Sequence, residues 1–257
     1  MNFDGLDTSI MAPALAAGVL VTATHVPMGQ QVLKRGIIFI DLAIAQIAAL
    51  GVLLAYSLGF ESSTVAVQAT AFGSALLGAL LLYQCERLWS DHLEAIIGSV
   101  FILAATAGIL LLANNPRGSE HLKDVLVGQI LWVNLNQLLP IVGLYVGILA
   151  AWYGLRAEHR PALFYILFSL TVTASVQLVG IYLVFATLII PALAVRRLAM
   201  PCQSLMAGYL LSLAGFASGL VISALFDLPS GAVIVWMLAV TGILVSSLIT
   251  AKHQHAG

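Results

Sequence analysis

The stretch from Val179 to Met200 reads VGIYLVFATLIIPALAVRRLAM, and the rest of the chain is interpreted outward from it. It is strongly apolar, it contains Pro191, and it is closed by two positive charges, Arg196 and Arg197. An apolar segment that ends in basic residues is typical of a membrane crossing that arrives at the cytoplasmic surface. We therefore predict that this corner lies in the cytoplasm. We also expect it to take part in transmitting whatever activity the protein has.

The composition of the whole chain is that of an integral membrane protein. Of its 257 residues, 61% are hydrophobic and 8% are charged, whereas a soluble domain carries about 25% charged residues. Most apolar runs have about 17–25 residues, which suits helices that cross a hydrocarbon core. The formal net charge is −1 and no basic patch is present, so nothing indicates a nucleic-acid partner. The sequence predicts one all-α, polytopic transmembrane domain over residues 1–257, surrounded by membrane lipid.

The apolar runs predict about nine transmembrane helices. Their ranges are 9–26, 36–59, 64–84, 93–113, 138–155, 162–177, 179–198, 204–225 and 231–250. Residues 162–198 are too long for one upright helix at about 1.5 Å per residue, although a single crossing, and hence eight helices, stays open. Lys34 and Arg35 mark the first connection as cytoplasmic. Two crossings within 162–198 then bring Arg196 and Arg197 to the same side, with the N-terminus outside and the C-terminus inside.

Two shorter features concern the packing of the bundle. Residues 125–133, VLVGQILWV, are too short to span and predict a half-helix or interfacial segment on the outer side. Gly143 with Gly147, and Gly215 with Gly219, form G-x-x-x-G pairs, which support close helix packing in membranes. Such pairs are also common in any polytopic bundle.

Polar residues inside the apolar runs are the candidates for a transport path. Asp41 is the most informative, because an intramembrane carboxylate costs on the order of 3 kcal/mol on insertion scales and is a functional candidate by default. Gln46 follows on the same predicted helix, roughly 140° away at about 100° per residue, so both cannot face one site on a straight helix. The alternative is that Asp41 pairs with a nearby basic residue or a backbone amide close to the membrane surface.

Three further polar positions have weaker interpretations. Gln177, at the outer end of its predicted helix, either lines the path or packs against a neighbouring carbonyl group. His25 precedes Pro27 at the end of the first predicted helix and is expected at the membrane interface. The residues DHLE at 91–94 resemble a small metal-binding cluster, but charges at a helix start also interact favourably with the helix dipole, and this interpretation is preferred.

The sequence carries no motif of an enzyme that binds ATP or hydrolyses common substrates. It lacks G-x-x-x-x-G-K-[ST], the loop that cradles ATP phosphates. It also lacks G-x-S-x-G and H-E-x-x-H. Nothing in these residues therefore resembles an enzyme site, and we expect neither an enzyme nor a stably bound cofactor.

Three stretches together resemble a known family. PMGQQVLKRGIIFIDLAIAQIAALG, at 27–51, resembles the segment in which the permeases of zinc, manganese and iron ABC importers carry a G…V…RR…GDALSHA-type motif. LVGIYLVFATLIIPALAVRRLA, at 178–199, is similar to their VGxLLVxALLIxPAAxA segment. ISALFDLPSGAVIVWM, at 222–237, is similar to their S…DLPxGA segment before the last helix. Order and spacing agree as well, so the resemblance covers nearly the whole chain.

The resemblance implies a type II importer permease in the bacterial inner or plasma membrane, which moves a divalent metal ion into the cytoplasm. Two copies of the permease would form the path, two separate ATP-binding cassette ATPase subunits would dock below, and an extracytoplasmic metal-binding protein would deliver the ion. The segment Ala192–Cys202 that follows Pro191 would be the coupling helix. Arg196 and Arg197 would then sit in a groove of the ATPase.

The sequence departs from the family motif at one position. The motif has a histidine four residues after the aspartate; Asp41 matches the aspartate, whereas Ala45 stands where the histidine is expected and Gln46 is next to it. Imidazole suits zinc, and carboxylate and amide oxygens suit harder ions such as manganese. The alternatives are a type II permease for a metal chelate or another solute, and a self-contained secondary transporter, which usually has repeated halves.

Overall fold

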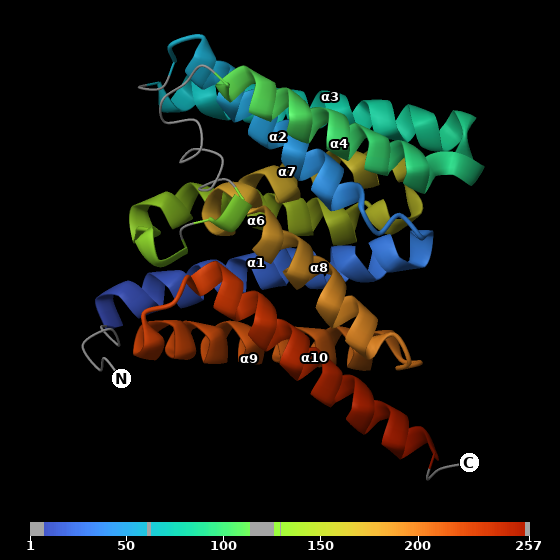
Figure 1. Ribbon diagram of the computed structural model, residues 1–257. Helices are drawn as coiled ribbons and strands as arrows, with labels where there is room; N and C mark the ends of the chain where they lie inside the picture. Colours follow the sequence, from blue (N-terminus) through green and yellow to red (C-terminus); the bar gives the residue numbers. More distant parts are fainter. Residues whose placement is uncertain (1–7, 61–62, 114–125, 129, 255–257) are drawn as a thin grey trace. The chain divides into compact units, whose positions relative to one another are not determined.

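The computed structural model describes residues 8–60, 63–113, 126–128 and 130–254. These residues contain nine long α-helices and no strand, as predicted (Figure 1). The helices are α1 (Thr8–Arg35), α2 (Ile40–Ser57), α3 (Thr64–Leu88), α4 (Leu93–Leu112), α6 (Leu135–Gly154), α7 (Pro161–Val179), α8 (Ile181–Val195), α9 (Pro201–Phe226) and α10 (Ser230–Gln254). Short 3-10 helices are η2 (Ser90–His92), η3 (Ile130–Trp132) and η4 (Ala157–His159).

Seven helices in the described ranges are long and apolar enough to cross a membrane: α1, α2, α3, α4, α7, α9 and α10. The apolar helix α8 has 15 residues, and the apolar part of α6 is Leu138–Gly154. The chain is therefore a multi-pass membrane protein. The side of the membrane on which each terminus lies stays a prediction.

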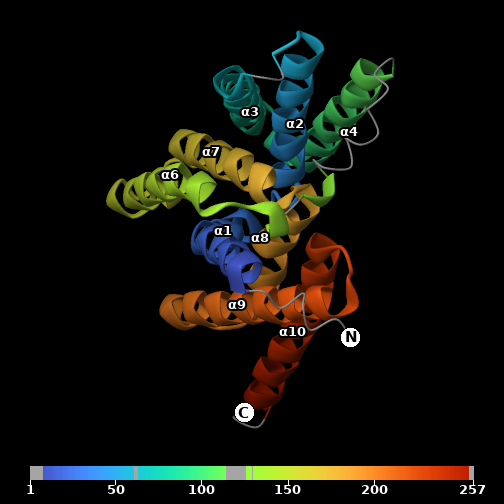
Figure 2. The same cartoon turned by 90° about the vertical axis from the view of Figure 1, so that its left-hand side faces the viewer.

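Contacts divide the chain into two compact units. In residues 1–35, 127–145 and 178–257, α1 packs on α8 and α9, and α10 packs on the same two helices. In residues 36–126 and 146–177, α2 packs against both α3 and α4, as Figure 2 shows. α2 is thus the central helix of this three-helix group.

Helix α1 continues through Pro27 to Arg35, so the predicted end at residue 26 is wrong. Proline lacks the N–H that would bond the carbonyl oxygen of residue i−4, which here is Ala23. The hydroxyl group of Tyr209, on α9, donates to this carbonyl oxygen at 3.2 Å. A neighbouring helix therefore supplies the missing donor, which is how membrane proteins tolerate proline within a helix.

The predicted break between two helices in 162–198 is confirmed, and it falls at Gly180. α7 ends at Val179 and α8 begins at Ile181, while Gly180 itself has φ +83°. The backbone of Gly128, with φ +71°, lies against this break, and a Cβ on Gly180 would be 2.4 Å from the Gly128 nitrogen. Two glycines thus let the chain before α6 pack directly on the α7–α8 junction.

The segment 125–133 is described only in part. Residues 126 and 127 are helical and Ile130–Trp132 form η3, whereas residues 125 and 129 lie outside the described ranges. The half-helix expected there stays a prediction.

The two G-x-x-x-G pairs have different surroundings. A Cβ on Gly219 would be 2.6 Å from Cα of Ile234, and one on Gly215 would be 2.6 Å from the Leu238 side chain, so this pair brings α9 and α10 together. Gly143 and Gly147 on α6 have no atom of another described segment within 4 Å of the Cβ position. Of the two pairs, only Gly215 with Gly219 packs two helices together within the described residues.

Candidate functional site

Asp41 lies in the first turn of α2, which begins at Ile40 and not at residue 36 as predicted. The helix starts late because Gly36 has φ +70° and the following residues form a turn. Asp41 is 1% exposed, and neither of its carboxylate oxygens has a hydrogen-bond partner among the described residues. The N-terminus of a helix favours a negative charge, which offsets only part of the cost of burying a carboxylate here.

A second carboxylate lies at the same end of α2. Glu94, in the first turn of α4, accepts a hydrogen bond from the backbone N–H of Ile38 through Oε1 at 2.5 Å. Its other oxygen, Oε2, is buried and has no partner in the described part of the chain. Ile38 comes three residues before Asp41, so the carboxylates of Glu94 and Asp41 both lie at the N-terminal end of α2. The sequence analysis assigned Glu94 only to the dipole of its own helix.

Oxygen ligands of this kind suit hard divalent cations such as Mn²⁺. Within the described ranges, however, no group of three or more His, Cys, Asp or Glu side chains could hold a metal ion. The two carboxylates at this end of α2 are fewer than the four ligands of a closed structural metal site.

Gln46 lies on the same helix as Asp41 and is also buried, with 6% of its surface exposed. Its Oε1 atom has no hydrogen-bond partner among the described residues. Ala45, which occupies the position expected for a histidine, is 1% exposed. Helix α2 is therefore enclosed by protein and carries two polar side chains with unused hydrogen-bonding capacity.

Gln177 is bonded to another glutamine. The side-chain amide of Gln68, on α3, donates to Oε1 of Gln177, near the end of α7, at 2.5 Å. Gln177 is exposed, so this pair lies at the surface of its unit. The sequence analysis considered a neighbouring carbonyl as its partner, and the structure gives a side-chain amide group.

The packing of α3 on α2 shows that this glutamine pair is distant from Asp41. The hydroxyl group of Ser74 donates to the carbonyl oxygen of Ile47 at 3.1 Å. Further along, a Cβ on Gly51 would be 2.6 Å from the carbonyl oxygen of Thr70. The helices are therefore antiparallel, and the glutamine pair lies roughly 18 Å from Asp41 along the axis at about 1.5 Å per residue. The structure does not bring Gln177 and Asp41 into one site.

His25 lies inside α1 and is fully buried, where an interfacial position was expected. Its Nδ1 atom is 2.9 Å from the carbonyl oxygen of Val21 and 3.1 Å from Oγ1 of Thr24. Its Nε2 atom, and Oγ1 of Thr22 one turn earlier, have no hydrogen-bond partner among the described residues. The sequence analysis placed His25 at the membrane interface because it ended the helix at residue 26, and it did not consider Thr22.

The basic corner follows directly from α8. The helix runs through Pro191 to Val195, and α9 begins at Pro201. The predicted coupling segment, 192–202, is thus not a separate helix: its first residues complete α8 and its last residues begin α9. Proline removes only one hydrogen bond. A Cβ on Gly242 of α10 would be 2.8 Å from Ile190, before the proline, and 3.9 Å from Ala194, after it, so α10 lies against α8 on both sides of Pro191.

Arg196 and Arg197 are exposed in the turn after α8. Nη1 of Arg197 donates to Oγ1 of Thr250, on α10, at 2.5 Å, and Nη1 of Arg196 donates to the carbonyl oxygen of Leu193 at 3.3 Å. No described carboxylate forms an ion pair with either arginine. The corner therefore presents positive charge that no described carboxylate neutralises, and it is hydrogen-bonded to α10.

Comparison with known proteins finds relatives that match most of the chain. It is 23% identical over 242 residues to the high-affinity zinc uptake system membrane protein ZnuB of Haemophilus influenzae, covering 86% of this chain and 91% of that protein. It is 29% identical over 254 residues to the manganese transport system membrane protein MntC of Halalkalibacterium halodurans, covering 90% and 84%.

A solved structure has the same fold. A chain of PsaBC from Streptococcus pneumoniae, in complex with Fab, superposes with a TM-score of 0.71 at 20% sequence identity, over 95% of this chain and 91% of that chain. The profile of the ABC 3 transport family matches residues 7–158 and 148–250. These two matches together include eight of the nine long helices in full and α10 up to residue 250. The chain belongs to the ABC 3 transport family.

Proposed function

We propose that the chain is the membrane-spanning permease subunit of an ABC importer that moves a divalent metal ion, such as zinc, manganese or iron, into the cytoplasm. A separate ATPase subunit would supply the energy. The observation that carries the proposal is the family match over nearly the whole chain, together with similar full-length relatives named for zinc and manganese transport. The metal ion is the transported substrate, and no stably bound cofactor is part of the proposal.

Asp41 is the first candidate for contact with the ion. A buried carboxylate without a partner is energetically unfavourable, and a passing cation would offset that penalty. The unused Oε2 of Glu94 supports a second oxygen ligand at this end of α2. Because Ala45 cannot coordinate a metal, the ligands near Asp41 favour harder ions such as manganese over zinc.

Gln46 and Gln177 enter the proposal as polar positions further along the path. Gln46 has a free amide oxygen within the enclosed helix α2. Gln177 forms its pair with Gln68 roughly 18 Å from Asp41 along that helix. Amide oxygens at two depths would contact a partly dehydrated ion one after the other along the path.

The turn after α8 is the proposed contact with the ATPase. Arg196 and Arg197 are exposed and free of ion pairs with described carboxylates. An acidic groove on the ATPase would complement them. Pro191 lies buried one turn before the end of α8, and the Arg197–Thr250 hydrogen bond connects the turn with α10, so a displacement there would reach two helices.

A homodimer and an extracytoplasmic metal-binding protein complete the proposed importer. Gly143 and Gly147 present an unoccupied G-x-x-x-G face on α6, next to Leu139 and Val146, which are 71% and 62% exposed. Such a face suits close packing of a second copy. Oxidative cross-linking of a Val146→Cys variant in membranes tests the dimer, and a purely monomeric product would count against it.

Uptake of radioactive manganese and zinc in cells that lack this gene tests the proposed function. Restoring the wild-type gene should restore accumulation of at least one ion, whereas Asp41→Asn should lower it at least tenfold at equal protein level in the membrane. Asn keeps the size of the side chain and removes its charge. Unchanged accumulation in the gene-deletion cells would refute the importer, and normal uptake by Asp41→Asn would refute only the role of that carboxylate.

A further inference from the structure

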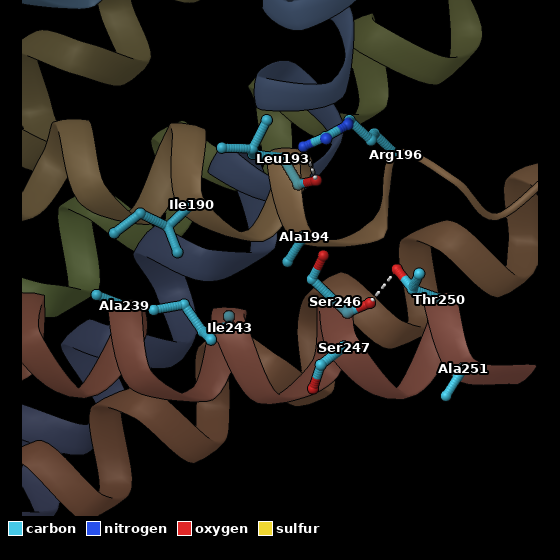
Figure 3. A pocket seen from close by; sticks show the side chains of 11 residues that line it. Ile190, Leu193, Ala194, Arg196, Ala239, Ile243, Ser246, Ser247, Thr250 and Ala251 are labelled. Atoms are coloured by element: carbon cyan, nitrogen blue, oxygen red, sulfur yellow. Dashed lines mark hydrogen bonds between the residues drawn. The ribbon is translucent and has the colours of Figure 1, made fainter.

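A groove of about 600 Å³ lies between α8 and α10 (Figure 3). Ile190 and Leu193 line it from α8, and Ala239 and Ile243 line it from α10. The helices touch at Gly242, where a Cβ would be 2.8 Å from the Ile190 side chain. Ile243 is 70% exposed, so the groove opens along the outside of α10.

The lining changes from apolar to polar along α10. The part near Ala239 is formed by aliphatic side chains, whereas Ser246, Ser247 and Thr250 add hydroxyl groups toward the end of the helix. Arg196 lines the groove from the turn after α8, and Figure 3 shows its guanidinium group turned back toward the carbonyl oxygen of Leu193. From residue 239 to residue 250 the groove extends about 16 Å at about 1.5 Å per residue.

This gradient runs in the direction expected for an amphiphile in a bilayer. The apolar span of α10 is Ser230–Ala251, so the hydroxyl and guanidinium groups come at the end of the span and the aliphatic part lies within it. The groove therefore offers hydrocarbon contacts at membrane depth and polar contacts at the membrane surface.

The charge at the polar end is positive. Among the residues that the structure describes, no carboxylate lines the groove. Arg196 has five N–H donors, and one of them, on Nη1, bonds the carbonyl oxygen of Leu193. Arg197 adds a second positive charge in the same turn. An anionic group at this end would meet charge complementarity and free donors in a fork that matches a phosphate.

We propose that the groove binds one anionic phospholipid, with its phosphate at Arg196 and an acyl chain along Ile190, Ala239 and Ile243. Basic pockets between transmembrane helices recognise anionic headgroups by the same means. The groove volume falls within the roughly 300–1,000 Å³ of small-molecule sites. The bound lipid shares Arg196 with the proposed ATPase contact, which would leave Arg197 for the ATPase, and its presence does not depend on which solute is moved.

Native mass spectrometry of the full chain in mild detergent, without ATPase or metal, tests this site. The probes are phosphatidylglycerol, phosphatidylcholine and inorganic phosphate. Wild-type protein should retain one phosphatidylglycerol at least fivefold more tightly than phosphatidylcholine. Arg196→Gln should weaken phosphatidylglycerol about fivefold, the loss expected for one basic group at a membrane surface. Ala239→Phe, which fills the apolar end, should weaken both lipids.

Two matched variants control for changes elsewhere. Arg160→Gln removes an exposed arginine outside the groove, and Leu248→Phe enlarges a residue of α10 that is 70% exposed and does not line it. Both should keep phosphatidylglycerol affinity within about twofold. Gel filtration and thermal unfolding confirm that each variant is folded.

Several results would overturn the lipid site. They are equal binding of both lipids by wild-type protein, unchanged binding by Arg196→Gln, equal loss with Leu248→Phe, and displacement of the lipid by inorganic phosphate alone. Loss of a dimer with Ala239→Phe at unchanged lipid affinity would assign the groove to a second copy of the chain instead. Because no transport is measured, failure of the lipid site and failure of the importer are separate outcomes.

Discussion

Replacement of Gly180 by alanine tests the close contact that defines the α7–α8 break. Gly180 has φ +83° and ψ 162°, a region that only glycine adopts readily and that costs other residues about 1–3 kcal/mol. The added Cβ would also be 2.4 Å from the nitrogen of Gly128 and 2.5 Å from the carbonyl carbon of Val127. Both are backbone atoms, so the chain must shift, which adds about 1–3 kcal/mol.

The sum, about 2–6 kcal/mol, is a large part of the roughly 5–15 kcal/mol that stabilises a typical domain. We expect Gly180→Ala to lower the midpoint of thermal unfolding in detergent by about 5 °C or more. The assay is fluorescence-detected unfolding of purified protein, with the amount in the membrane recorded for each variant.

Gly73→Ala on α3 is the matched control. No other described segment lies within 4 Å of its Cβ position, and its φ carries no penalty for alanine. Alanine within a helix is more favourable than glycine by up to about 1 kcal/mol, so this variant should be as stable as wild type or slightly more so. If Gly180→Ala matched this control, the direct contact between Gly180 and Gly128 would be refuted.

Three other predictions concern the corner, the proline in α1 and the second carboxylate. Arg196→Glu combined with Arg197→Glu should abolish co-purification of the ATPase while membrane insertion stays normal; retained ATPase would contradict the proposed contact. Tyr209→Phe should destabilise the protein by about 1–3 kcal/mol in thermal unfolding, because the Ala23 carbonyl oxygen loses its donor; an unchanged midpoint would mean that another group replaces it. Glu94→Gln should reduce manganese uptake less than Asp41→Asn does, since the glutamine oxygen can still accept from the Ile38 N–H; an equal reduction would give the two carboxylates equal roles.

The sequence predicted the nine helices because each apolar run is a local property that the membrane imposes on length and composition. The break near residue 180 was also predictable, because residues 162–198 are too long for one upright helix and the charge pattern favoured two helices. The end of α1 was predicted wrongly at residue 26, just before Pro27. Its continuation depends on Tyr209, a contact between distant parts of the sequence that periodicity does not show.

The candidate site was predictable only where it depends on local sequence and not on contacts between helices. Asp41 and Gln46 stand out as polar residues in an apolar run, and the structure encloses both. The approach of Glu94 to the start of α2 and the bond between Gln68 and Gln177 depend on how helices pair, which spacing along one helix does not reveal. Likewise, only packing distinguishes the G-x-x-x-G pair that joins α9 to α10 from the pair on α6.

The tyrosine bound at the proline of α1 has a mechanical consequence. Proline makes that turn the easiest place for α1 to bend, and the hydroxyl of Tyr209 holds the exposed carbonyl group in place from α9. Bending α1 at this point therefore breaks or strains a bond to α9. Bending of α1 at Pro27 and separation from α9 are thus coupled: α1 cannot bend freely there until the hydrogen bond from Tyr209 is broken.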